Sequence, residues 1–412
     1  FEMVLAKTGS TDAPRTFILD NGGHSIKLGA ASDDRPRIIP NCIVKAKSER
    51  KRVFIGEELS ECLDRSALYF LLPFEKGYVV NWDVQQQVWE RSFRGMDVAD
   101  ARLMLTDANY AVPATRDLCP EIIFELLGFG SMFKSSSAGF MGLCRRRSRA
   151  CLVLDCGFSF THVIPIFDGK IIQQGVLRMD IGGKVLTNQL KEWVTYRELN
   201  VMEETYVMSD AKEDACFVSL DFEADMQIAR HRDSKNTMIR EYVLPDFSAH
   251  SRGFLRERTG AAGKDGLQAI TLNLERFTVP EALFSPADIG LHQMGVAECV
   301  VESTRRCPKN LRSALLSSIL PIGGSTKFPN FRQRLLRDVR SIVDASIDVK
   351  LGESIPGQAD GVDPVEAAWQ SAKKAVGEGA IDKKCITKAQ FAEHGEDLLR
   401  EKFYNFLEWD DE

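Results

Sequence analysis

Long hydrophobic runs are missing from this sequence, and so are closely paired cysteines. No apolar stretch approaches the roughly 20 residues that a membrane-spanning helix needs, so we expect no membrane partner. The ten cysteines are scattered without a Cys-x-x-Cys pair. Cys151 and Cys156 flank a predicted strand, whose period places them on opposite faces. These absences argue against a zinc site and a disulfide framework, and indicate reduced thiols in the nucleus or cytosol.

The sequence also lacks a recognisable secretory signal and a strongly basic balance. Residues 1–14 are polar and mixed, without a basic-then-apolar order, and are interpreted as a flexible tail. The formal net charge is −6 with 27% charged residues, which argues against a general polyanion binder. With 412 residues and 44% hydrophobic content, the chain can bury one large or two ordinary cores.

Two similar stretches organise what is present. Residues 17–29 read FILDNGGHSIKLG and residues 152–165 read LVLDCGFSFTHVIP. Each places an apolar strand, an Asp, a turn with Gly and a returning strand in the same order. Two such hairpins facing each other would present backbone N–H groups beside Asp20 and Asp155, which suits a phosphate chain with a divalent metal.

Two further glycine pairs have the pattern of an anion site. Gly182-Gly183 comes directly before a predicted helix, and Gly323-Gly324 lies between an apolar segment and another helix. A helix N-terminus binds anions through its unpaired N–H groups. Either pair alone is weak evidence, because glycine also begins many purely structural helices.

Alternating strands and helices predict an α/β fold with two lobes around a central cleft, where small ligands preferentially bind. We expect a first lobe over 15–155, completed by 365–412, and a second lobe over 156–364. Smaller parts are a tip subdomain at 42–70 and an outer subdomain at 182–291. The polar, glycine-containing stretch 246–271 is interpreted as an insertion or loop within the outer subdomain.

The tip carries a short basic segment with two open interpretations. It is either a solvated loop or a contact to the phosphate backbone of DNA. The connector at 144–149, CRRRSR, leaves the same choice open. The DNA-contact candidates in the tip are Lys45, Lys47, Arg50, Lys51 and Arg52.

Taken in order, these motifs resemble the actin family over nearly the whole chain, from about residue 16 to 403. The residues that carry the resemblance are the two hairpins, RMDIGGKVLTNQL at 178–190, KEDACFVSLDFEADM at 212–226, PEALFSP at 280–286 and IGGSTKFP at 322–329. The resemblance implies a two-lobed fold of duplicated ribonuclease-H-like domains around a nucleotide cleft. It also implies ATP or ADP as ligand, with magnesium. The cofactor-binding positions that match are Asp20, Gly22, Gly23, Lys27, Asp155, Gly157, Gly182, Lys212, Glu213, Gly323, Gly324 and Phe328.

Other positions depart from the family pattern. Gly23 stands where a hydroxyl would bond a terminal phosphate, and His24 adds a side chain where the backbone must approach phosphate. Phe158 replaces an acidic residue in the second turn, and Ser136 is expected at the position of the water-orienting glutamine. His162 matches a family histidine but is interpreted as a satisfied cleft residue. We therefore predict no catalytic residue and no enzyme, and a nucleotide, if bound, would act as a structural ligand.

Within the family, the chain resembles the nuclear actin-related proteins of chromatin-remodelling complexes. The supporting stretches include IIPNC at 38–42, LPFEKGYVVNWDVQQQVW at 72–89 and YVLPDFS at 242–248. The resemblance implies a scaffold subunit that supports exchange of the Z variant of histone class two-A. Implied partners are a Snf2-type ATPase, a zinc-finger HIT-type subunit, histones and nucleosomal DNA, in the nucleus or also the cytoplasm.

Two other hypotheses stay open at the level of sequence. One is an active, ATP-hydrolysing actin of the cytoskeleton, although the short and charged tip argues against filament formation. The other is a sugar kinase or chaperone ATPase of the same fold, since a shared fold does not settle function. The full-length match to actin-type motifs counts against a sugar kinase or a chaperone ATPase.

Overall fold

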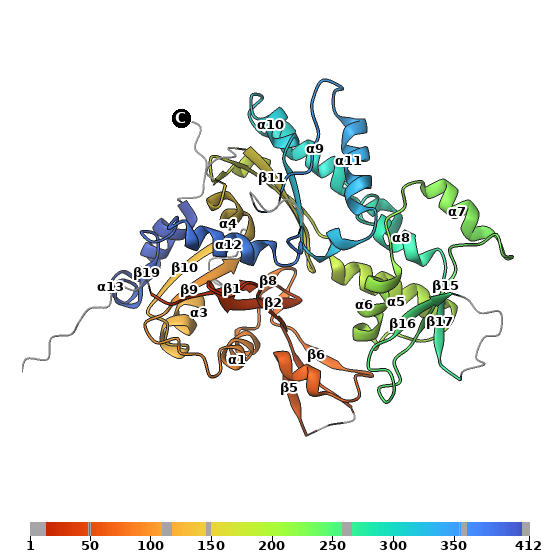
Figure 1. Cartoon of the computed structure of the whole chain (residues 1–412), viewed down its shortest axis with the longest axis horizontal. Coiled ribbons are helices and arrows are strands. Elements are labelled where there is room, and N and C mark those ends of the chain that lie inside the picture. Colours follow the sequence, from red (N-terminus) through yellow and green to blue (C-terminus); the bar gives the residue numbers. More distant parts are fainter. Residues whose placement is uncertain are drawn as a thin grey trace, which may run out of the picture.

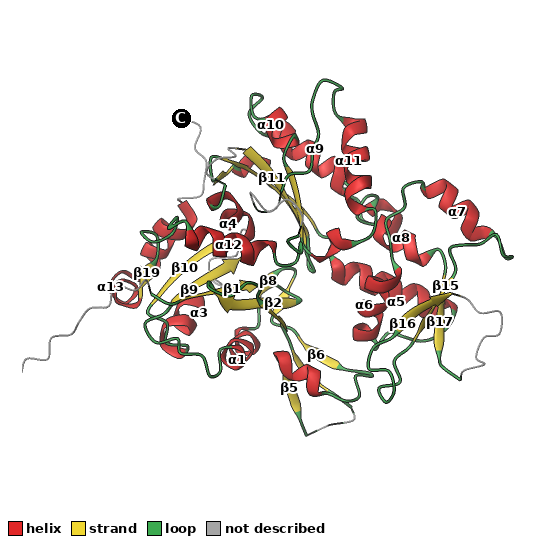
Figure 2. Ribbon diagram, viewed as in Figure 1, coloured by secondary structure: helices red, strands yellow, loops and turns green. Residues whose placement is uncertain are grey.

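The computed structural model describes residues 14–47, 49, 51–108, 118–145, 150–257, 266–353, 355 and 361–405. Two large sheets, each with helices packed against it, form the body of the molecule, and smaller sheets lie at its periphery (Figures 1 and 2). Within these ranges, no helix is both long enough and apolar enough to cross a bilayer. The α/β fold predicted from the sequence is confirmed.

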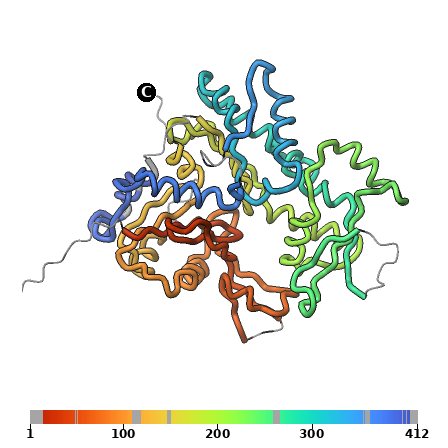
Figure 3. The backbone as a smooth tube through the Cα atoms, in the orientation of Figure 1, coloured from red at the N-terminus to blue at the C-terminus, as the bar shows by residue number. Residues whose placement is uncertain are grey.

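The first hairpin lies inside a six-stranded sheet with the order β19-β10-β9-β1-β2-β3. Helix α12 returns from late in the chain to pack beside β1, where Trp369 Nε1 donates to Ile18 O at 3.1 Å (Figure 3). Trp89 and Trp369 are fully buried in the core of this half. The elements are β1 (Thr16–Asn21), β2 (Ser25–Ala30), β3 (Arg37–Pro40), α1 (Trp82–Ser92), β9 (Arg102–Asp107), α3 (Leu118–Glu121), η2 (Ile122–Leu126), β10 (Ser131–Ser136), α12 (Ala367–Gly377), β19 (Ile386–Thr387), α13 (Lys388–Leu399) and η6 (Arg400–Asn405).

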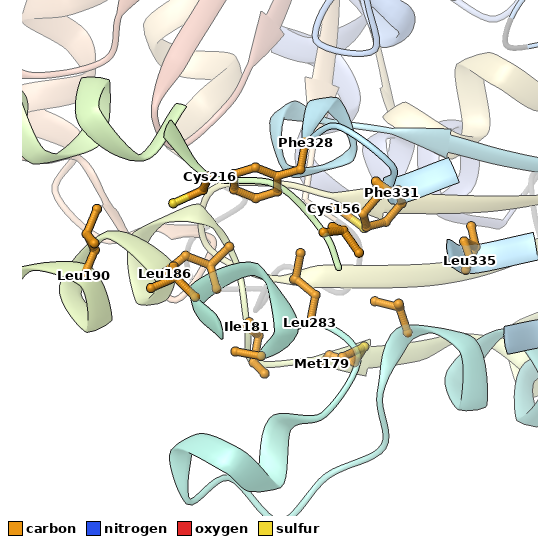
Figure 4. Close-up of a cluster of buried hydrophobic side chains, with 14 of the residues drawn as sticks. Cys156, Met179, Ile181, Leu186, Leu190, Cys216, Leu283, Phe328, Phe331 and Leu335 are labelled. Carbon is orange, nitrogen blue, oxygen red and sulfur yellow. The ribbon is translucent and has the colours of Figure 1, made fainter. Parts of the chain in front are cut away.

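The second hairpin lies inside a five-stranded sheet, in which β14 pairs with β12 beside the row β13-β12-β11-β18. Its core contains the cluster drawn in Figure 4, where Phe331 lies beside Cys156. The elements are α4 (Ser137–Leu143), β11 (Ala150–Cys156), β12 (Thr161–Phe167), β13 (Lys170–Ile171), η3 (Gln173–Gly175), β14 (Leu177–Met179), α9 (Val296–Arg306), α10 (Arg312–Leu316), β18 (Ile319–Ile322), η5 (Gly324–Lys327) and α11 (Phe331–Ile342).

The two hairpins repeat one arrangement, as the sequence predicts. In each, the first strand pairs antiparallel with its return strand and parallel with a strand from later in the chain, β9 or β18. Asp20 stands opposite Lys27 in the first hairpin, and Asp155 stands opposite His162 in the second. Each aspartate therefore lies near the end of its strand, beside the turn.

Two small sheets extend from the first half. The chain leaves the β7–β8 sheet and enters helix α1, which Asn81 caps because its side chain accepts from Val84 N at 3.1 Å. The three-stranded tip sheet has the order β5-β4-β6, with Phe54 and Val44 fully buried beneath it. The elements are β4 (Ile43–Lys45), β5 (Val53–Ile55), η1 (Gly56–Glu61), β6 (Tyr69–Leu71), β7 (Phe74–Glu75) and β8 (Tyr78–Val79).

The outer part of the second half differs from the sequence expectation at 246–271. This stretch contains strand β16 and the start of β17, which both pair with β15; residues 258–265 lie outside the described residues. Strand formation here depends on pairing with β15, which composition does not reveal. The elements are α5 (Gly183–Arg197), α6 (Thr205–Ala215), α7 (Phe222–Arg230), β15 (Arg240–Val243), β16 (Phe254–Glu257), β17 (Ala269–Leu272), α8 (Glu275–Glu281) and η4 (Pro286–Ile289).

Candidate functional site

A cavity of about 570 Å³ is lined by both hairpins and by residues of α5, α6 and η5. Its wall contains every cofactor-binding position predicted from the sequence except Gly182. The next residue, Gly183, lines the cavity instead. Residues that lie far apart in the chain, such as Asp20 and Gly323, are thus brought to one cleft.

The two hairpin aspartates lie in the cavity wall with defined partners. Asp20 accepts from Thr106 Oγ1 at 2.7 Å and forms an ion pair with Lys27 Nζ at 3.2 Å. Asp155 accepts from Ser137 Oγ at 3.0 Å. Burial, with a smaller contribution from the charge of Asp20, raises the pKa of Asp155 to about 6. A cation near both carboxylates would favour their ionised forms and offset the free-energy cost of burying the Asp155 charge.

The serine beside Asp155 differs by one position from the sequence expectation. Ser136 ends strand β10 and caps helix α4, because its hydroxyl accepts from Gly139 N at 3.1 Å. Ser137 therefore projects into the cavity in its place. Thr106 was also missed by sequence reasoning. The sequence feature that could have identified Thr106 is its position near the end of the apolar run that forms β9. In the structure, β9 pairs in parallel with β1, which carries Asp20.

At the other end of the cavity, Lys212 has a structural role. The buried ammonium group donates to Gly183 O at 3.1 Å and to Thr187 Oγ1 at 2.8 Å, so it ties α6 to the start of α5. Glu213 and Phe328 line the cavity nearby. Gly323 has φ +88°, and a Cβ there would lie 2.4 Å from Cys156 O. Only glycine permits this approach of η5 to the second hairpin.

Two aromatic rings meet between the hairpin turns. The ring centroids of His24 and Phe158 lie 4.9 Å apart with an interplanar angle of 40°. The His24 ring is surrounded by the walls of the cleft, yet its surface is open to the cavity. Burial in the cleft, together with the charges of Lys212 and Lys27, lowers its pKa to about 4. His24 is therefore neutral at physiological pH.

His162 is the second histidine near the turns, and it is buried. Its ring centroid lies 4.2 Å from that of Phe160, and among the described residues its Nδ1 has no hydrogen-bond partner. Burial, together with the charge of Arg178 on the neighbouring strand, lowers the pKa of His162 to about 3. The residue packs as a neutral ring in the folded state.

The buried state of His162 predicts a specific acid sensitivity. The unfolded chain protonates this histidine below about pH 6.5, whereas the folded protein does not until pH falls far lower, so stability drops as pH falls through 6.5. We expect His162→Gln to remove about 2 kcal/mol of the stability difference between pH 7.5 and pH 5. Urea unfolding at the two pH values measures this. The exposed His292→Gln is the control, and an equal pH dependence in both variants would contradict the prediction.

The family of the chain follows from comparison with known proteins. The sequence model described as "Actin" matches residues 11–404. The chain therefore belongs to the actin family. It is 42% identical over 402 residues to an actin-like protein of Caenorhabditis elegans, which covers 96% of this chain and 94% of that protein. It is 38% identical over 397 residues to actin-related protein 6 of Drosophila melanogaster (93% and 98% coverage) and 33% identical over 426 residues to actin-related protein 6 of Arabidopsis thaliana (94% and 99%).

Actin family members bind nucleotide with magnesium, and part of this cavity fits such a ligand. Asp20 and Asp155 supply the carboxylate oxygens that Mg²⁺ prefers, and Lys27 lies beside them. Among the described residues, no group of three His, Cys, Asp or Glu could hold a metal on its own. The remaining ligands would have to be water and phosphate oxygens, which is usual for magnesium. The rings of His24 and Phe158 lie between the two hairpin turns and reduce the space that a ligand has there.

The tip of the first half is joined to the start of helix α6 in the second half. Arg65 Nη1 donates to the Tyr206 hydroxyl at 3.0 Å, and Ala67 N donates to Glu204 Oε2 at 3.1 Å. Tyr206 also packs against the buried cluster of the tip. Lys47 pairs with Glu203 at 2.6 Å in solvent. These contacts hold the two sides of the cleft together.

The basic residues of the tip divide into two groups. Lys47 and Arg52 are paired with acidic residues of this chain, Glu203 and Glu61. Lys45 and Lys51 are exposed, and Lys45 stands between Val53 and Tyr69 in the sheet register. Arg50 lies outside the described residues, as do residues 146–149 of the second basic segment.

Proposed function

We propose that this chain is a non-catalytic, actin-related scaffold subunit of a nuclear chromatin-remodelling complex. The complex would exchange the Z variant of histone class two-A into nucleosomes, and the subunit would support engagement of nucleosomal DNA and histones. Its direct partners would be a Snf2-type ATPase and a zinc-finger HIT-type subunit. Support comes from similarity to proteins named actin-related protein 6 over nearly the whole chain.

The observation that favours a scaffold over an ATPase is the ring pair of His24 and Phe158 between the hairpin turns. Hydrolysis needs a water held in line with the terminal phosphate and donors aimed at the developing charge. Phe158 can neither position water nor bind a metal, and Ser137 has a short side chain that already donates to Asp155. A nucleotide bound here would stabilise the closed lobes by linkage instead of being consumed.

Purification of the tagged chain from nuclei tests the scaffold role. We expect a Snf2-type ATPase and a zinc-finger HIT-type subunit to co-purify in stoichiometric amounts at moderate salt. Their absence from the purified material would refute the proposal.

A second candidate function is an active ATPase, because Asp20, Lys27 and Asp155 line the cavity and His162 stands opposite Asp155 in the second hairpin. Steady ATP turnover by the purified chain that disappears in Asp155→Ala would support this candidate. Turnover at the background rate in both proteins would exclude it.

DNA contact by the tip within the complex leads to a further prediction. Lys45 and Lys51 are exposed, so their charges can neutralise phosphates. We expect Lys45→Glu/Lys51→Glu to weaken the nucleosome affinity of the assembled complex by about 3- to 10-fold. The slope of log affinity against log salt concentration should also become shallower, by an amount that corresponds to about two fewer released counterions. Binding isotherms between 50 and 200 mM salt measure both quantities.

The matched control is Lys309→Glu/Lys383→Glu, which makes the same change in charge at exposed positions away from the tip. It should alter affinity far less and leave the salt dependence almost unchanged. If both double variants behave alike, the tip is a solvated loop and not a DNA contact.

A further inference from the structure

The two hairpin turns of the cleft touch each other at the end where His24 and Phe158 meet. A Cβ on Gly23 would lie 3.0 Å from Ser159 Oγ of the opposite turn. Behind the turns, a Cβ on Gly77 would overlap the Phe160 ring, with a separation of 2.0 Å from Cε1. The β7–β8 hairpin therefore closes this end of the cavity from the outside.

Arg178 fixes this closed end. Its guanidinium donates to the Tyr78 hydroxyl at 3.1 Å and to Lys76 O at 2.8 Å, and it lies 4.9 Å from the centroid of the Phe160 ring. These bonds join β14 of the second half to the β7–β8 hairpin of the first half. Arg178 thus holds the β7–β8 hairpin against the second turn, where the Phe160 ring lies.

The lysines that line the cavity already have partners within the chain. Lys27 is paired with Asp20, Lys212 donates to two oxygens of α5, and Lys327 is paired with Asp363 at 2.8 Å. His24 is neutral. Each phosphate added to a ligand brings further negative charge to the turns, while the lysines that would balance it are already engaged.

We infer that His24 and Phe158 limit the length of the phosphate chain, so that the cleft binds a nucleoside mono- or diphosphate in preference to the triphosphate. Phosphate chains bind along the backbone N–H groups of tight turns. In this cleft the ring centroids of His24 and Phe158 lie 4.9 Å apart between the turns, so a third phosphate that continued along the turns would meet the rings. The inference rests on the nucleotide binding that we propose for the cleft, and it assigns His24 as a specificity-determining residue.

Calorimetric titration of the purified chain with ATP, ADP, AMP and adenosine, each with magnesium, tests this directly. We expect ADP to bind at least 10-fold more tightly than ATP. His24→Gly should raise the affinity for ATP at least 10-fold and change the affinity for ADP less than 3-fold. Phe158→Ala, which removes the opposite ring, should act in the same direction and covers the case in which His24→Gly fails to fold.

The control is His292→Gly, an exposed histidine that does not line the cavity, which should leave the ratio of the two affinities unchanged. Equal or tighter binding of ATP by the unmodified chain would overturn the inference, as would an unchanged ratio in folded His24→Gly and Phe158→Ala. Failure to bind any of the four ligands would overturn it as well. The scaffold role would survive each of these results, because co-purification from nuclei tests it separately.

Discussion

Glu281→Ala is expected to be among the most destabilising single substitutions in this chain. Arg334 of α11 donates to both carboxylate oxygens of Glu281 in α8, at 2.7 and 3.0 Å, and both side chains are buried. Arg334 also donates to Ser219 O and Asp338, so its guanidinium joins three segments behind the cleft. Removal of Glu281 leaves this charge without its principal partner in a buried position, which should cost about 3–5 kcal/mol.

Thermal and urea unfolding measure this effect, and we expect the melting temperature to fall by about 4–6 °C for a chain of this size. Glu302→Ala is the matched control. It breaks the solvent-exposed i,i+4 pair with Arg306 and should cost no more than about 0.5 kcal/mol. The double variant Glu281→Leu/Arg334→Met should be more stable than Glu281→Ala, because no charge is left unpaired. Equal stability of Glu281→Ala and Glu302→Ala would show that the buried pair contributes nothing.

The parts of the fold that the sequence predicts correctly are those with local signals. An Asp at the end of an apolar run, followed by a glycine turn, identifies both hairpins, and the register then places Asp20 opposite Lys27. Asn81 at the start of α1 is a local signal of the same kind. Such features depend on residues within one or two turns of chain, so the sequence alone contains the necessary information.

The contacts across the cleft could not be predicted in this way. Arg65 and Tyr206 are 141 positions apart, and Arg178 and Tyr78 are 100 apart, so each contact exists only after the whole chain has folded.

The prediction that Ser136 faces the cavity, where Ser137 lies instead, fails for a different reason. A shift of one residue at a strand end reverses which side chain faces the cavity, and the boundary between β10 and α4 has no glycine or proline to mark it.

The second large effect is expected at Gly182, the residue that precedes helix α5. Its backbone is extended, with φ −150°, so that any residue could adopt this conformation. The space around it is the constraint. A Cβ would lie 2.5 Å from Phe158 O and 2.7 Å from Phe160 N. Both atoms belong to the backbone of the second hairpin turn and cannot rotate away, so Gly182→Ala must push the turn and the helix apart.

We expect Gly182→Ala to lower the free energy of unfolding by about 1–3 kcal/mol, as overpacking in a rigid site does. Gly377→Ala in helix α12 is the control, because a Cβ there meets nothing within 4 Å, and alanine favours a helix more than glycine does. It should leave stability unchanged or raise it. Since Gly183 N–H donates to Gly157 O at 3.0 Å, the displaced turn would also lose its bond to the helix. Gly182 therefore affects the cleft without lining it, because it sets the distance between α5 and the turn that carries Phe158. Equal stability of the two alanine variants would disprove this role.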